Sequence, residues 1–63
     1  MDIQEIIDKR DGQVPKVYQD IEKLTTAIQD SDWEGVVDIA HSIYERSVVV
    51  VVFDQLINPE KYH

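Results

Sequence analysis

The feature that most constrains the fold is a run of five valines within residues 47–53, which read SVVVVVF. β-Branched residues favour strands, but a strand needs a partner with free edge groups. No other segment alternates apolar and polar residues at period two. Five valines cost a helix only about 2–3 kcal/mol, a cost that tertiary burial can exceed. The run therefore favours a helix, with an intermolecular strand as the alternative.

Helical periodicity extends over most of the remaining chain. Apolar residues from Val17 to Ile28 form one stripe at helical spacing, which predicts a helix over about residues 15–29. A second pattern begins at Trp33, where Ser31 and Glu34 have the spacing of a capping box. It continues to an Asn-Pro pair that predicts the helix end. We expect this second helix over about residues 32–57.

A shorter element precedes these two helices. Three isoleucines within the first seven residues share one helical face, which predicts a helix over about residues 3–10. Gly12 suits a helix end, and Pro15 suits the start of the next helix. The sequence therefore predicts a connector between the first two helices.

The apolar character of the valine run also predicts assembly. Six consecutive apolar residues cover every side of a helix, and the other predicted helices are too short to surround them. A chain of 63 residues without cysteine is marginally stable alone. We expect residues 1–63 to form a single all-α domain, a short N-terminal helix plus an antiparallel helical hairpin, assembling as a homodimeric four-helix-type bundle. The residues expected at the oligomer interface are Tyr44, Val48, Val49, Val50, Val51, Val52, Phe53 and Leu56.

Charge and composition exclude several functions. Thirteen acidic and six basic residues give a net charge of −7, whereas a nucleic-acid binder needs a basic patch. The N-terminus lacks the features of a signal peptide, and the valine run is too short to cross a bilayer. We expect a cytoplasmic protein with no direct nucleic-acid or membrane partner. No Gly-rich phosphate loop or Ser-His-Asp set is present, so we expect no enzyme, cofactor or metal.

Acidic residues gather around the start of the helix predicted over about residues 32–57, and residues 24–45 contain no Lys or Arg. They either cap and solvate that helix or dock a basic partner. The residues assigned to partner binding are Asp30, Asp32, Glu34, Asp38, His41 and Glu45. We expect a small acidic homo-oligomer that binds and regulates or inhibits a larger protein, a task typical of small bacterial or phage proteins.

Two further sets of residues leave other readings open. An oligomer that binds a small anionic signalling nucleotide at its subunit junctions would need converging basic residues. The available ones are Lys9, Arg10, Lys16, Lys23 and Arg46. Asp38 and His41 also have the i, i+3 spacing of metal sites in helical bundles, but they lie on the polar side of their helix.

The stretch DWEGVVDIAHSI, residues 32–43, resembles the active helix of histidine phosphotransfer domains. The resemblance implies an exposed His41 on a four-helix bundle, accepting a phosphoryl group from an aspartate. A Lys-Gly pair usually follows in that family, and Tyr44 and Glu45 occupy those positions here. A degenerate phosphotransfer-like module using His41 is therefore another alternative.

The aromatic residues and the C-terminal tail complete the expectations. Tyr18, Trp33 and Tyr44 lie at helical spacing, which is typical of core or interface anchors. The tail over residues 60–63 is expected to fray, although Tyr62 has the reach to fold back across a dimer seam.

Overall fold

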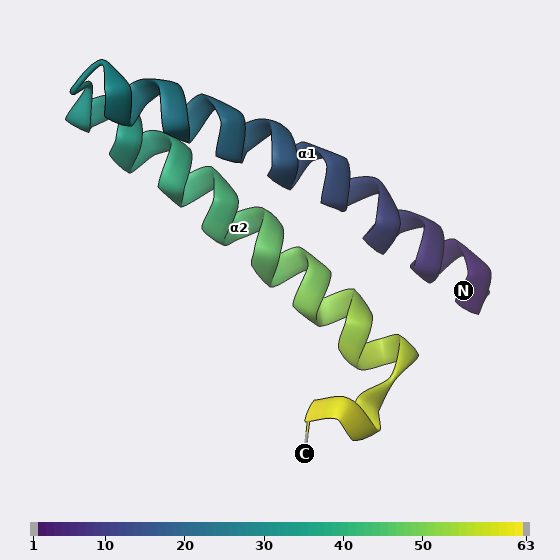
Figure 1. Cartoon of the computed structure of the whole chain (residues 1–63). Helices are drawn as coiled ribbons and strands as arrows, with labels where there is room; N and C mark the ends of the chain where they lie inside the picture. The colour runs from purple at the N-terminus through teal and green to yellow at the C-terminus, as the bar shows by residue number, and fades with distance from the viewer. Residues whose placement is uncertain (1, 63) are drawn as a thin grey trace.

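The computed structural model describes residues 2–62 as a helical hairpin (Figure 1). Helix α1 spans Ile3–Gln29, helix α2 spans Trp33–Ile57, and a short 3-10 helix, η1, spans Pro59–Tyr62. The two long helices run antiparallel and pack against each other. The expected all-α hairpin is confirmed. The alternative of a strand at residues 47–53 is wrong, because the whole valine run lies within α2.

Helix α1 is unbroken where the sequence predicted a short helix over residues 3–10, a connector and a second helix from residue 15. Pro15 lies inside it. An internal proline removes one hydrogen bond and costs about 3 kcal/mol. Asp11, whose carbonyl loses that bond, lies on the exposed side and keeps access to water. The predicted break is wrong because continuing the helix aligns its first three turns with α2, a tertiary gain that local propensity does not include.

The two helices meet along a seam whose residues alternate at spacings of three and four, the heptad repeat of coiled-coil packing. Every seam residue is buried or half-buried. The seam consists of Ile6, Arg10, Gln13, Val17, Asp20, Leu24 and Ala27 on α1, and of Val36, Ile39, Ile43, Arg46, Val50, Phe53 and Ile57 on α2. The heptad persists across Pro15, which explains why α1 stays whole.

The turn between the helices is a Schellman motif. The Asp32 amide donates to the Ala27 carbonyl at 2.9 Å, and the Ser31 amide donates to the Ile28 carbonyl at 3.1 Å. Ser31 adopts a left-handed conformation with φ of 55°. That conformation reverses the chain in a minimum of residues, although it is strained for a residue with a β-carbon.

Helix α2 is capped one residue later than the sequence predicted. The Asp32 carboxylate accepts the Gly35 amide at 3.1 Å, so Asp32 is the N-cap. The capping box expected from Ser31 and Glu34 is wrong, because Ser31 already closes α1. A β-carbon at Gly35 would collide with the Asp32 carboxylate, so glycine makes room for this cap.

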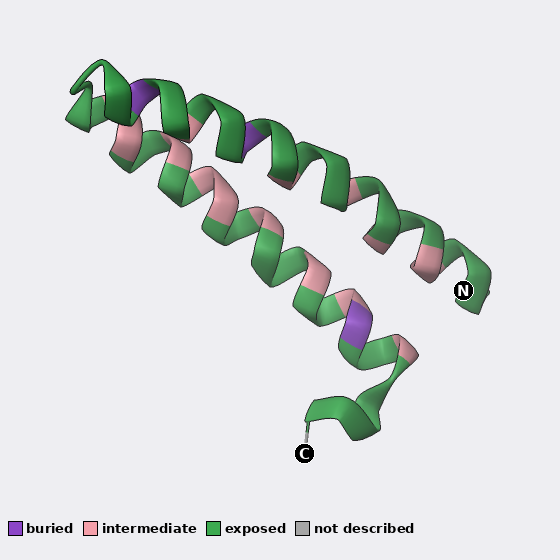
Figure 2. Cartoon of the chain, in the orientation of Figure 1, coloured by how far each residue is buried: buried purple, intermediate pink, exposed green. Residues whose placement is uncertain are grey.

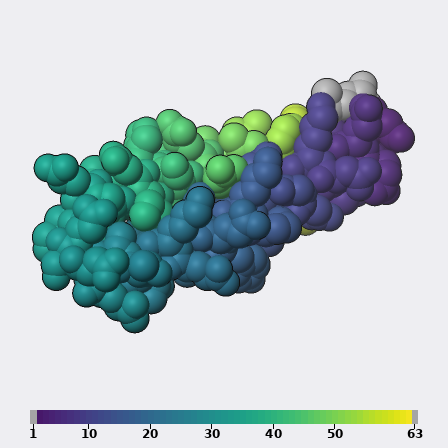
Figure 3. Space-filling view, turned by 90° about the horizontal axis from the view of Figure 1, so that it is seen from above, coloured from purple at the N-terminus to yellow at the C-terminus, as the bar shows by residue number. Residues whose placement is uncertain are grey.

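The hairpin is long and thin, and its core is small (Figures 2 and 3). Its Cα atoms extend over 43 × 23 × 14 Å. Among the described residues, Ala27 is the only buried hydrophobic one, and the other two buried residues are Asp20 and Asp54. Between residues 2 and 62, neither helix has the length and apolar character that crossing a membrane requires. One hairpin therefore leaves most of its apolar side chains in contact with solvent.

Candidate functional site

One ion pair lies in the middle of the seam. The Arg46 Nε donates to the Asp20 Oδ2 at 2.9 Å. The Asp20 side chain is 9% exposed and that of Arg46 is 36% exposed. Because a carboxylate at a seam position needs a charged partner, the pair favours the observed register of α1 against α2 over registers that would separate the two groups.

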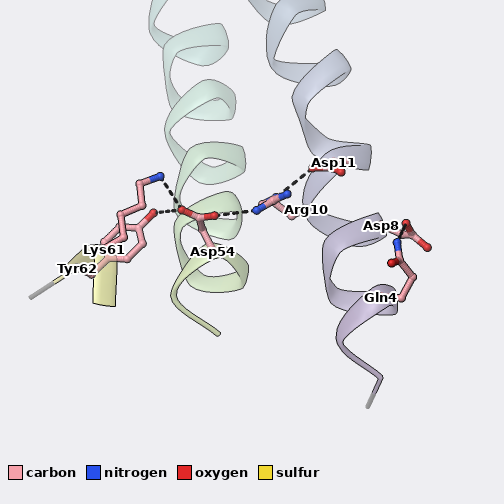
Figure 4. Close-up of polar contacts among 7 residues, drawn as sticks. All are labelled: Gln4, Asp8, Arg10, Asp11, Asp54, Lys61 and Tyr62. Atoms are coloured by element: carbon pink, nitrogen blue, oxygen red, sulfur yellow. Dashed lines mark hydrogen bonds and ion pairs between the residues drawn. The ribbon is translucent and has the colours of Figure 1, made fainter. Parts of the chain in front are cut away.

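A second polar cluster fastens the open end of the hairpin (Figure 4). Arg10 Nη1 donates to one oxygen of the buried Asp54 at 2.9 Å, and Lys61 Nζ donates to the other at 2.9 Å. The Tyr62 hydroxyl donates to that second oxygen as well. The hydrogen bonds from Tyr62, Lys61 and Arg10 hold the pKa of Asp54 well below its ordinary value.

The tail that we expected to fray is instead ordered as η1 up to Tyr62, and His63 lies outside the described residues. Its Lys61 ammonium also lies 5.6 Å from the centre of the Tyr62 ring. The prediction failed because it treated the tail as polar and free, whereas Asp54 offers it a charged acceptor. Tyr62 folds back onto α2 of its own chain.

The residues assigned to partner binding are all exposed. Four of them, spaced 4, 3 and 4 residues apart, form one stripe on α2 that we name the acidic edge. It comprises Glu34, Asp38, His41 and Glu45. Asp30 and Asp32 lie in the turn beside it, where they serve as the C-cap of α1 and the N-cap of α2.

His41 has one recorded partner on the acidic edge. Its Nε2 lies 2.9 Å from Glu45 Oε1, and both side chains are exposed. Within residues 2–62, no three His, Cys, Asp or Glu side chains converge as a metal site would require. A phosphoryl group on that nitrogen would lie beside the Glu45 carboxylate, so the geometry adds nothing to the phosphotransfer alternative.

The basic residues expected to hold a nucleotide are only partly available. Arg46 is engaged by Asp20, and Arg10 is engaged by Asp54 and also by Asp11 at 3.0 Å. The sequence reasoning missed these seam acids. Their signal was available in the sequence: Asp20 lies at helical spacing between Val17 and Leu24, and Asp54 directly follows the apolar run that ends at Phe53.

The residues expected at the oligomer interface do not share one surface. Val50 and Phe53 are half-buried in the seam, whereas the other six are exposed and spread around α2. Those six are Tyr44, Val48, Val49, Val51, Val52 and Leu56. Tyr18, Trp33 and Tyr44, expected as core or interface anchors, are also exposed, so they belong to no core within this hairpin.

An apolar groove runs between the helices on one side of the seam. It has a volume of about 390 Å³. Its lining consists of Val14, Val17, Tyr18, Ile21, Ser47, Val50 and Val51. Grooves on the other side of the seam are lined by charged residues, among them Lys23 and Asp30 near the turn and Glu45 further along α2. The two sides of the hairpin therefore differ in character.

Comparisons with protein-family models, with curated proteins and with solved structures gave no match to this chain.

Proposed function

We propose that this chain is a non-enzymatic helical protein that acts as a homo-oligomer and regulates a larger protein by docking through the acidic edge. The observation that carries this proposal is the charge along α2. Glu34, Asp38 and Glu45 are exposed, and no Lys or Arg occurs from residue 24 through 45. A continuous exposed stripe of carboxylates favours a partner with a complementary basic surface.

The seam ion pair supports the same proposal. Arg46 is adjacent in sequence to Glu45, but its guanidinium donates to Asp20 across the seam. The positive charge of Arg46 is therefore paired with the buried Asp20 carboxylate. Within residues 2–62 Arg46 forms no ion pair with the acidic edge, so it does not neutralise the carboxylates there. With a net charge of −7, the chain would also attract a basic partner over a distance, an effect that weakens as salt is added.

The experiment is affinity capture from a lysate of the source cells, comparing the wild-type chain with an edge variant. The variant carries Glu34→Lys, Asp38→Lys and Glu45→Lys, and it spares Asp32 because that residue caps α2. We expect a partner retained by the wild type to bind the edge variant at least about tenfold more weakly at 0.15 M salt.

A matched control makes the same charge change on α1, with Glu5→Lys, Asp8→Lys and Glu22→Lys, all at exposed positions. This control should retain the partner, and circular dichroism should show equal helicity in all three proteins. A partner that binds the edge variant as tightly as the wild type would refute docking through the acidic edge.

A further inference from the structure

One side of the hairpin carries an uncharged surface that the described fold leaves uncovered. It consists of the residues that directly follow a seam residue between Gln13 and Ala27 on α1 and between Val36 and Val50 on α2, together with Trp33 one turn earlier on α2. We name it the apolar face. It comprises Val14, Tyr18, Ile21, Thr25 and Ile28 on α1, and Trp33, Val37, Ala40, Tyr44, Ser47 and Val51 on α2. The groove described above lies within this face and shows that the two helices contribute to the same side.

No charged residue lies among these eleven positions, although 30% of the residues in the chain are charged. The next positions of the same kind toward the open end of the hairpin are the exposed Asp11 and the buried Asp54, which bound the apolar face there. The residues that precede seam positions include Lys16, Lys23 and Glu45, and these belong to the opposite side. A face kept free of charge over eleven positions is not expected of a solvated helix surface, where charges normally alternate with apolar residues.

Large side chains lie exposed on this face. Trp33 is 62% exposed, and Tyr18 and Tyr44 are exposed to a similar degree. Monomeric proteins rarely leave a large contiguous apolar patch open to water. Aromatic residues concentrate at the centres of protein interfaces, where they supply most of the binding energy.

The areas match what a dimer needs. The hairpin exposes 4813 Å², whereas a compact monomer of 7.3 kDa would expose about 4,200 Å². A standard interface buries about 800 Å² on each partner. The two longer Cα extents of the hairpin, 43 and 23 Å, give its whole broad side an area of roughly 1,000 Å², and the apolar face occupies the part of it nearer the turn. The broad side that carries the apolar face is therefore comparable in size with one partner's share of a standard interface.

We infer that the apolar face is where two copies of this chain pack face to face around a twofold axis. An uncharged face made mainly of aromatic and aliphatic side chains, with the hydroxyls of Thr25 and Ser47 bonded within their own helices, is complementary to itself, as a twofold contact requires. A basic partner would find no counter-charge there, and the net charge of −7 repels anionic lipid surfaces. Four helices would then enclose the face in a bundle.

This inference deepens the homo-oligomer part of the proposed function by naming the surface, and it leaves the acidic edge free. The edge residues do not belong to the apolar face, so each copy in the dimer still presents its own edge. Self-association and partner docking then use separate surfaces, which makes their tests independent.

Two adjacent valines provide a matched test. Val51 follows the seam residue Val50 and lies on the apolar face, whereas Val52 precedes the seam residue Phe53 and belongs to the other side. They are 40% and 49% exposed, respectively. A buried, unpaired carboxylate is strongly unfavourable, so Val51→Glu should weaken the dimer by about 100-fold or more. Val52→Glu should leave the dimer within about threefold of wild type, as expected for a surface substitution.

Sedimentation equilibrium of the full chain measures both variants, and Tyr44→Glu provides a second test on the face in case Val51→Glu fails to fold. Circular dichroism checks that each variant stays helical. Equal dimerisation of wild type, Val51→Glu and Tyr44→Glu would overturn the inference, as would loss of the dimer in Val52→Glu alone. Binding of the monomer to vesicles of anionic phospholipid, with no dimer, would overturn it too. None of these outcomes alters the capture result with the edge variant, which tests the proposed docking separately.

Discussion

Removing either member of the seam ion pair will destabilise the hairpin, and the two removals will differ in size. A hydrogen bond between charged groups contributes about 1.5–3 kcal/mol to stability. Arg46 keeps about a third of its side-chain exposure, so solvent screening lowers this contribution. We expect Asp20→Ala to cost about 1 kcal/mol, because Arg46 can turn its guanidinium toward water.

Replacing the arginine should cost more. Arg46→Ala leaves the Asp20 carboxylate, whose side chain is 9% exposed, without its recorded partner, and it removes the aliphatic stem that packs in the seam. We expect a loss of about 2–3 kcal/mol. In a domain of this size, each kcal/mol lowers the melting temperature by roughly 4–8 °C.

The assay is urea unfolding followed by circular dichroism, with a double-mutant cycle over Asp20→Ala and Arg46→Ala. Protein concentration must be the same throughout, because self-association adds to apparent stability. Glu45→Ala serves as the exposed control. Among residues 2–62 Glu45 pairs with the exposed His41 alone, so the change should stay within about 0.5 kcal/mol. A coupling energy near zero between Asp20 and Arg46, or an Asp20→Ala loss larger than that of Arg46→Ala, would refute this reasoning.

Two further predictions concern the turn and the open end of the hairpin. Ser31→Gly should stabilise the protein by up to about 1 kcal/mol in the same assay, because glycine takes the left-handed conformation of residue 31 without strain. Ser31→Ala should give no gain. Equal effects of the two substitutions would contradict the strain assigned to Ser31. The three donors to Asp54 lower its folded-state pKa below the ordinary value of 3.8, so the stabilisation is present above pH 4 and is lost as pH falls below it. The melting temperature of Asp54→Asn should therefore fall less between pH 5 and pH 2 than that of the wild type, and parallel curves would contradict the role given to the cluster.

The sequence predicted the helical class and the turn because both depend on local patterns. Continuous periodicity up to Asn58 favoured a helix through the valine run, and the absence of any alternating segment left no strand partner within the chain. An intermolecular strand stayed open until the structure placed the run in α2. The pattern placed the turn correctly at residues 30–32. It misplaced the cap by one residue, because Ser31 and Asp32 are both good caps and only the chain reversal decides between them.

The unbroken α1 could not be predicted from local signals. Gly12 and Pro15 both favour a break, and the seam that overrides them exists only once α2 lies alongside. Ile6, Arg10, Gln13 and Val17 have heptad spacing in the sequence. The repeat is hard to recognise there, because Arg10 and Gln13 occupy positions where an apolar residue is expected.

Neither the ordered tail nor the position of the apolar face could be predicted from local sequence patterns, because both depend on how α1 packs against α2. Lys61 of η1 donates to Asp54, which directly follows Phe53. From the sequence alone Asp54 resembles an exposed residue of a helix, because its contact with Arg10 exists only once α1 packs against α2. The valines were expected to act as one interface. The seam instead takes Val50 and leaves Val51 and Val52 on opposite sides, a division that requires knowing which face of α2 meets α1.

The most direct test of the central claim is the molar mass of the wild-type chain, measured by sedimentation equilibrium from low to high micromolar concentration. Emission from Trp33, the only tryptophan, can be recorded on the same samples. The account predicts a species of about 14.6 kDa, twice the 7.3 kDa of one chain, with Trp33 emission shifting to shorter wavelength as the dimer forms. A stable 7.3 kDa monomer at every concentration, with Trp33 emission unchanged and typical of a solvent-exposed indole, would contradict it.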